Sequence, residues 1–192
     1  MAEAVRKIEN ATMADLEALP ANVKGEIIDG VLYTQHRPYA HHQFTLMAIC
    51  SEIYKPYRLG ERGPGGWWIL PEPGIELPNA PEVSPDVAGW RHKRMLALPS
   101  DDDPLRVVPD WICEIFTKRT RAYALHTKKP FYARIGVEWL WYVDMEAETL
   151  TVQRLHQGKW LELGVYAGDL CVRAEPFDVV EINLGRWWSR VM

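Results

Sequence analysis

The chain has 192 residues and a formal net charge of −4, with 47% hydrophobic and 25% charged residues. This length suits one domain with a sizeable core, and the composition is that of an ordinary globular protein. The negative charge excludes a general nucleic-acid coat, but it does not exclude a nuclease, because metal-binding acids themselves make a protein more acidic. We therefore expect a single domain over residues 1–192.

The cysteines and the N-terminus bear on the cellular compartment. Cys50, Cys113 and Cys171 are widely separated, stand in apolar contexts and lack the spacing of a zinc site, which is typical of reduced, packed thiols. The N-terminus lacks a signal-peptide core, and no apolar run reaches the length of a membrane span. The sequence thus predicts a cytoplasmic protein without membrane contact.

Three elements are predicted before residue 40. Residues 1–10 are polar and are expected to be loose. A short helix is expected from Thr12, which can cap it, through Leu19. The segment Glu26–Tyr33 is typical of a β-hairpin, because Asp29-Gly30 stands between two β-rich runs.

A longer helix and a strand come next. From about His41 to Lys55, apolar residues recur at helical spacing and predict an amphipathic helix. Pro56 and the glycines after it are expected to end that helix. Trp67–Leu70 then starts a strand, and Pro73–Leu77 is expected to continue the same hairpin.

The second half of the chain is expected to alternate strands with one helix over residues 120–135. The predicted strands are Asp86–Trp90, Trp111–Phe116, Trp139–Val143, Leu150–Leu155, Trp160–Leu163 and a short one within Asp178–Leu184. Strand–helix–strand order in the middle, with hairpins at both ends, predicts an α/β fold. Its centre would be a mixed β-sheet flanked by helices.

Two carboxylates stand where the strand pattern predicts buried side chains. Glu114 shares the strand alternation of Ile112 and Phe116, and Asp86 begins another apolar strand. A carboxylate on the apolar side of a strand is costly unless it is paired, protonated or bound to a metal. Because Lys128 follows fourteen residues after Glu114, we interpret the three as a site for Mg²⁺ or Mn²⁺, which can be held by two carboxylates and several waters. Salt-bridged core acids are the alternative.

Further acids and a histidine form a second tier of candidates. Asp110 has the same strand parity as Glu114 and could be its partner, although a place at the rim of the sheet is favoured. Surface or paired structural roles are favoured for the other acids, and a helix-start or peripheral role for the histidine over a transition-metal ligand. These candidates are Glu26, Glu72, Glu76 and His42, with His41 beside it.

A basic stretch lies close to Glu114 in sequence. Lys118, Arg119 and Arg121 could contact the phosphates of a nucleic acid. A solvated helix face explains the same charges equally well.

Residues 24–143 resemble the Uma2 family of bacterial endonucleases, which belongs to the PD-(D/E)xK nuclease superfamily. The resemblance is carried by an ordered set of segments along the chain. They are Glu26–Gly30, a histidine at the head of the first long helix, Pro85-Asp86-Val87, Pro109–Phe116, Lys128–Val137 and Glu138–Asp144.

The resemblance implies a restriction-endonuclease-like core that hydrolyses DNA phosphodiester bonds with Mg²⁺. Asp86 would be the first acid and Glu114 the second, with the backbone carbonyl of Ile115 as a further metal ligand. The superfamily's lysine would normally stand at Phe116, and the resemblance implies that it has shifted to Lys128. Lys118 is the weaker candidate for that role.

Two questions stay open on the sequence alone. Pro130 either kinks the helix over 120–135 or starts it, and the reach of Lys128 depends on which. The function is either that of an endonuclease, of a nucleic-acid- or partner-binding module that keeps the fold, or of a structural homodimer. The endonuclease hypothesis requires Asp86 and Glu114 on adjacent strands, beside an open cleft.

Overall fold

The computed structural model describes residues 5–36, 39–100 and 103–188. Its centre is a six-stranded mixed sheet in the order β11-β10-β9-β8-β7-β4, in which β8 and β9 run parallel and the other neighbours antiparallel. The strands are β4 (Trp67–Pro71), β7 (Val87–Arg91), β8 (Trp111–Phe116), β9 (Trp139–Asp144), β10 (Thr149–His156) and β11 (Lys159–Ala167). The five strands predicted between residues 86 and 163 correspond to β7 to β11.

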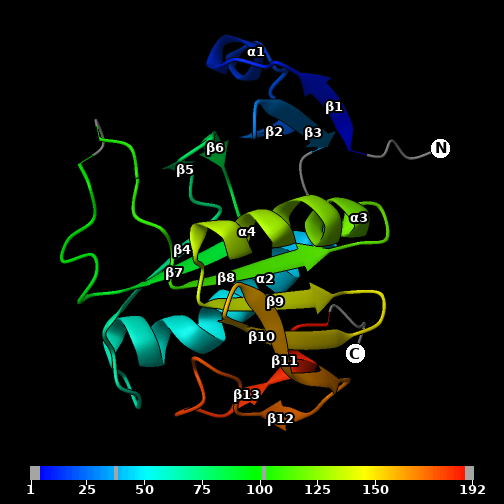
Figure 1. Ribbon diagram of the computed structural model, residues 1–192. Coiled ribbons are helices and arrows are strands. Elements are labelled where there is room, and N and C mark those ends of the chain that lie inside the picture. The colour runs from blue at the N-terminus through cyan, green and yellow to red at the C-terminus, as the bar shows by residue number, and fades with distance from the viewer. Residues whose placement is uncertain (1–4, 37–38, 101–102, 189–192) are drawn as a thin grey trace.

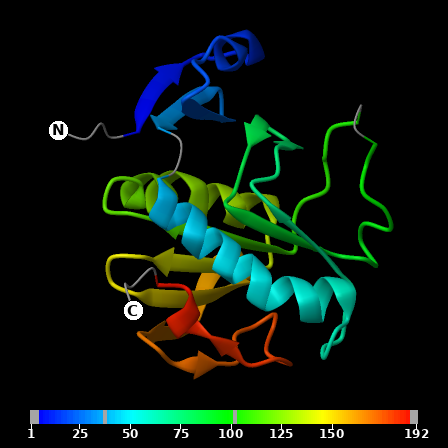
Figure 2. The same cartoon turned by 180° about the vertical axis from the view of Figure 1, so that it is seen from behind.

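Helices cover both faces of this sheet. Helix α2 (Ala40–Ile53) crosses one face beside the C-terminal segment, as Figure 2 shows. On the opposite face lie α3 (Arg121–Tyr123), a π-helical turn (Ala124–Lys128) and α4 (Lys129–Ile135), in front of β8 and β9 in Figure 1. The predicted mixed sheet flanked by helices is therefore confirmed.

A second sheet stands above the first in Figure 1 and has the order β1-β3-β2-β6-β5. Its hairpin turns at Asp29 and Gly30, whose φ angles of 53° and 75° fit the tight turn predicted for Asp-Gly. The elements are β1 (Arg6–Glu9), α1 (Met13–Glu17), β2 (Val23–Ile28), β3 (Val31–His36), β5 (Ile75–Leu77) and β6 (Ala80–Val83). Strand β2 carries Lys24 and Glu26, whose side chains reach Asp86 and Lys128 beside the central sheet.

Three sequence predictions were wrong in this half of the chain. Residues 6–9 were expected to be loose, but they pair with β3 as β1, while residues 1–4 lie outside the described residues. Pro56 does not end the second helix, because the chain widens into a π-helical turn, Tyr54–Leu59, before Gly60 stops it at a φ of 74°. Strands β4 and β5 do not share a hairpin, since β4 pairs with β7 and β5 with β6.

The C-terminal region adds a small two-stranded sheet of β12 (Cys171–Val172) and β13 (Ile182–Asn183), followed by a 3₁₀ turn, Leu184–Arg186. The short strand predicted within residues 178–184 is thus confirmed as β13. All three cysteines are free thiols, but the prediction that all are packed was wrong for Cys171. Its side chain is exposed because the neighbouring Val172 takes the inward position of β12.

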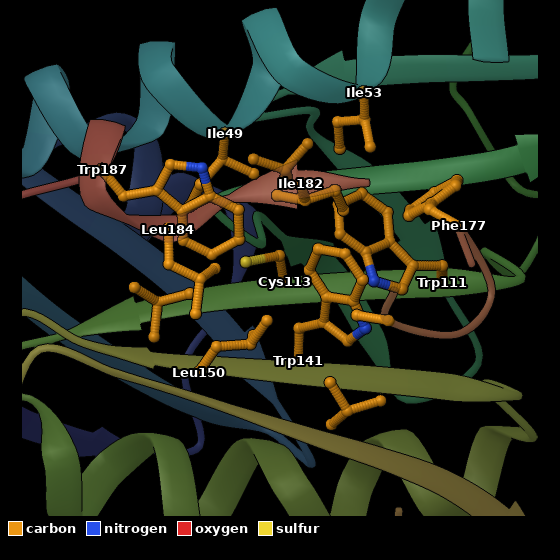
Figure 3. Packing of buried hydrophobic residues seen from close by; sticks show 14 of the residues in the cluster. Ile49, Ile53, Trp111, Cys113, Trp141, Leu150, Phe177, Ile182, Leu184 and Trp187 are labelled. Atoms are coloured by element: carbon orange, nitrogen blue, oxygen red, sulfur yellow. The ribbon is translucent and has the colours of Figure 1, made fainter. Parts of the chain in front are cut away.

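The face of the sheet under α2 is packed by aromatic rings together with aliphatic side chains, as Figure 3 shows. Phe177 lies at the centre of this cluster, with its ring centroid 4.8 Å from that of Trp111 and 5.5 Å from that of Trp141. The rings of Tyr57, from the π-helical turn after α2, and of Trp67, from β4, lie 4.6 and 5.1 Å from that of Phe177. This packing fixes β8 and β9, and so the frame on which Glu114 is held.

Within the described ranges, no helix is both long and apolar enough to cross a membrane.

Candidate active site

The register of β7 and β8 brings Asp86 and Glu114 together. Val87 pairs with Cys113, so the next position of each strand places Asp86 opposite Glu114 in the antiparallel pair. Val87 and Cys113 face α2, so by alternation the two acids face the side of α3 and α4. The geometry that the sequence analysis required, two acids on adjacent strands, is present.

Asp86 immediately precedes β7, and its carboxylate contacts other elements of the fold. Its Oδ2 accepts a hydrogen bond of 2.7 Å from the backbone N–H of Ile115. Its Oδ1 lies 3.3 Å from Nε2 of His42 and 4.0 Å from Nζ of Lys24. Asp86 is therefore held by backbone and side chains of three separate elements.

Glu114 belongs to a buried network around one lysine. Nζ of Lys128 lies 2.6 Å from Oε1 of Glu114 and 3.0 Å from Oε1 of Glu26. The hydroxyl of Tyr132 also donates to Oε1 of Glu114, at 2.6 Å, and that of Tyr123 donates to Oε2 of Glu26, at 3.0 Å. The network joins β2, β8 and the helical segment after β8.

Lys128 reaches this network from a helical run that continues past Pro130. The π-helical turn Ala124–Lys128 passes directly into α4, and the backbone at Lys128 and Lys129 is helical. The side chain of Lys128 is buried. Pro130 lies just after the widened turn, so it does not start the helical segment predicted over residues 120–135.

Burial acts to raise the pKa of both acids, but neighbouring cations reverse its effect only for Asp86. Burial, with added repulsion from Asp86 and Glu26, raises the pKa of Glu114 to about 7 despite the opposing charge of Lys128. Burial would also raise the pKa of Asp86, but His42, Lys24 and Lys128 outweigh it and lower that pKa to about 2. Near neutral pH, Asp86 is therefore ionised, whereas Glu114 can bind or release a proton.

The neighbouring cations respond to the same carboxylates. Burial would lower the pKa of Lys128, but Glu114, Glu26 and Asp86 outweigh it and raise the pKa. Burial would likewise lower the pKa of His42, and the adjacent Asp86 carboxylate raises it instead. The site thus combines three carboxylates with two lysines and a histidine in a small volume.

These groups lie along a cavity of about 620 Å³. Asp86, Glu114 and Lys128 line it together with Lys24 and His42. At its rim are segments from β3, the start of α2 and the loop after β8. The rim residues include Gln35, Tyr39, His41, Thr117, Lys118 and Arg119.

The donor set fits a hard divalent cation. In a strand, the N–H and C=O of one residue point toward the same neighbour, so the Ile115 carbonyl faces the side on which its N–H meets Asp86. Two carboxylates and a carbonyl are oxygen ligands that Mg²⁺ or Mn²⁺ accepts. Within the residues that the structure describes, no group of three His, Cys, Asp or Glu side chains is arranged to hold a metal, so waters would complete the coordination.

The structure places the second-tier acids in different surroundings, and one of the three joins the site. Glu26 belongs to the network around Lys128, whereas Glu76 pairs with Arg106 at 2.9 Å on the surface. Asp110 is buried at the start of β8, about 13 Å along the strand from Glu114, and lies 3.1 Å from Nη1 of Arg94. Asp110 and Glu76 are therefore not partners of Glu114.

The favoured interpretation of His42 as a helix-start or peripheral residue is confirmed for its place at the start of α2, but the side chain is not peripheral. Its ring is buried in the first turn of α2, with Nε2 directed at Asp86. Its Nδ1 is buried and has no hydrogen-bond partner among the described residues.

The three basic residues after β8 have different surroundings. Lys118 and Arg119 line the cavity. Arg121 instead pairs with Asp144, and its guanidinium lies 5.0 Å from the ring centroid of Phe116. The prediction that they contact nucleic acid therefore has more support for the first two.

Sequence reasoning missed Lys24, Tyr123 and Tyr132. The tyrosines are indistinguishable from core aromatics until the helical segment is placed against β8. Lys24 left a signal, because it precedes Glu26 by two residues in β2 and so shares its strand face.

Comparisons with known proteins agree with this geometry. The model of the Uma2 family, described as "Putative restriction endonuclease", matches residues 13–184. A crystal structure from Anabaena variabilis ATCC 29413, described as a "putative nuclease belonging to DUF820", is similar with a TM-score of 0.70 and 17% sequence identity. The alignment covers 93% of this chain and 98% of that one, and it shows a shared fold. No curated protein matches the chain.

Proposed function

The chain belongs to the Uma2 family of restriction-endonuclease-like proteins, and on that premise we propose that it is a Mg²⁺- or Mn²⁺-dependent endonuclease acting on DNA. The observation that carries the proposal is the pair Asp86 and Glu114, in register on one sheet face and open to the cavity. A purely structural pair of acids would not need access to a cavity. Neither acid is locked by an arginine among the described residues.

In this proposal Asp86, Glu114 and the Ile115 carbonyl hold the cation. A bound divalent cation would lower the pKa of a coordinated water and neutralise charge on a phosphoryl oxygen. The hydrogen bond from Ile115 N–H and the contact with His42 orient Asp86. Tyr132 and Lys128 orient Glu114 through Oε1.

Lys128 is the catalytic lysine of the proposal, as the sequence resemblance implied. Its ammonium lies in a buried, low-dielectric position against Glu114. A fixed positive charge there favours the negative charge that phosphoryl oxygens gain in the transition state. Lys118 and Arg119 at the rim would contact the flanking DNA phosphates.

The test is DNA cleavage by the purified protein. Wild-type protein with Mg²⁺ or Mn²⁺ should cut DNA, and EDTA should stop the reaction. Asp86→Asn should abolish cutting while the protein stays folded, because the amide oxygen is a weaker ligand for a hard cation. Glu76→Gln, a change at a surface acid, is the control and should cut like wild type.

Failure of the wild type to cut any single- or double-stranded DNA with either cation would overturn the endonuclease proposal. Retained DNA binding in that case would favour the binding module instead.

A further inference from the structure

The site contains two lysines with very different freedom to bind a ligand. An ammonium group has three N–H donors. Those of Lys128 face Oε1 of Glu114 at 2.6 Å, Oε1 of Glu26 at 3.0 Å and the carbonyl of Ser84 at 3.5 Å. The side chain is only 4% exposed. Lys128 could therefore bind a phosphate oxygen directly only by giving up one of these partners.

Lys24 approaches the same acids from the cavity side. It lies on the β2 face that also presents Glu26, and it lines the cavity. Its Nζ is 3.3 Å from Oε1 of Glu72 and 4.0 Å from Oδ1 of Asp86. Within the described parts of the chain, Glu72 is the acceptor at hydrogen-bond distance, so the ammonium keeps donors for a ligand.

We infer that Lys24 binds the phosphate group of the substrate directly, while Lys128 holds Glu114 and acts through its charge. The inference rests on the proposed function, because it names the group that receives the phosphate beside Asp86. A phosphate bound next to Asp86 lies within reach of the Lys24 ammonium, and lysine serves as a point-charge ligand for phosphate. The neighbouring Glu72 is one-third exposed, so a phosphate can take over its hydrogen bond.

The Lys24–Glu72 pair provides a matched control. If the structural role of Lys24 is this ion pair, Lys24→Met and Glu72→Gln will have the same effect, and if it is the 4.0 Å contact with Asp86, Lys24→Met will also weaken the response to Mn²⁺ alone. A phosphate-binding role separates them, because Glu72→Gln breaks the pair but leaves the ammonium in the cavity. Lys24→Met keeps the aliphatic stem, and Lys24→Arg keeps the charge.

The experiment measures the binding of thymidine 5′-monophosphate by thermal melts and tryptophan fluorescence, with saturating Mn²⁺ and in EDTA. Lys24→Met should weaken nucleotide binding about tenfold or more, the loss of one charge-assisted hydrogen bond. Its response to Mn²⁺ alone should persist or increase, since a positive charge near Asp86 is removed. Glu72→Gln should bind the nucleotide as tightly as wild type or more tightly, and Lys24→Arg should retain binding.

A cleavage assay supplies a second arm. Lys24→Met should lower kcat for DNA cleavage about a hundredfold, whereas Glu72→Gln should leave it near the wild-type value. If wild type fails to cut DNA but its nucleotide binding depends on Lys24, the endonuclease proposal fails and the phosphate site stands.

Three results would overturn the inference itself. One is equal nucleotide binding by Lys24→Met and wild type. Another is an equal loss in Lys24→Met and Glu72→Gln, which would leave only the structural pair. The third is a wild type that binds the nucleotide neither with Mn²⁺ nor in EDTA.

Discussion

At the scale of single residues, the buried carboxylates of the site lower the stability of the fold. Glu26, Asp86 and Glu114 are buried within reach of one buried lysine, so their repulsion is only partly offset. Burial raises the pKa of Glu114 to about 7, whereas pairing with His42, Lys24 and Lys128 holds Asp86 as an anion. A cation bound by both acids would relieve that repulsion, which is a reason for a site to carry it.

Glu114 should make the metal-free protein less stable as the pH rises. Its pKa is about 7 in the folded chain against an ordinary value of 4.5, so the folded state holds the proton more tightly. This stabilisation is complete below pH 4.5 and is lost as the pH rises through 7. In EDTA, Glu114→Gln should therefore gain stability relative to wild type between pH 5 and pH 8, as measured by urea unfolding.

Glu76→Gln is the control for this pH series, because its surface carboxylate pairs with Arg106 outside the site. Parallel stability curves for wild type and Glu114→Gln across that pH range would contradict the prediction.

At the scale of elements, the segment after β8 has two tasks. Lys118 and Arg119 line the cavity, whereas Arg121 ties the start of α3 to Asp144 at the end of β9. The division explains why neighbouring basic residues need not share a role. The first two line a cavity, and the third holds the element in place.

Lys118→Ala should weaken DNA binding and reduce the dependence of log K on log salt by about one. Arg121→Ala should change that slope less and instead lower the melting temperature, because Asp144 stays buried without its partner. Fluorescence anisotropy at several salt concentrations and thermal melts measure both. Equal losses of DNA binding in the two variants would restore Arg121 as a nucleic-acid contact.

At the scale of the whole molecule, the central sheet separates stability from chemistry. The aromatic cluster under α2 packs against one face. The acids lie on the other face, where β7 starts and β8 ends. A change in the aromatic cluster should therefore affect folding without removing the site. The homodimer named in the sequence analysis stays a prediction, which sedimentation of the purified protein will measure.

Millimolar Mn²⁺ should raise the melting temperature of wild type, since a ligand that binds only the folded state stabilises it by mass action. Asp86→Asn should lose this shift. Phe177→Ala should lose about 3–5 kcal/mol of stability but keep the Mn²⁺ shift, because Phe177 lies in the aromatic cluster. A wild-type melt that is unchanged at every Mn²⁺ concentration would contradict the metal site.

The sequence by itself determined the features that depend on neighbours along the chain. Alternation predicted β8 and showed that Glu114 lies on its apolar side, and Asp29-Gly30 predicted the hairpin of β2 and β3. The same strand pattern grouped Asp86 and Lys128 with Glu114, before the family resemblance implied a role for each of them. These predictions succeeded because strand periodicity and turn conformations are local properties.

Only the tertiary structure decided which other side chains share the site. Lys24 and Glu26 reach it because β2 pairs with β6, and His42 because the first turn of α2 lies beside Asp86. It also decided that all three donors of Lys128 are engaged, whereas Lys24 has Glu72 as its acceptor at hydrogen-bond distance within the described ranges. Such contacts join residues far apart in the chain, and they depend on how sheets and helices pack, which no local pattern encodes.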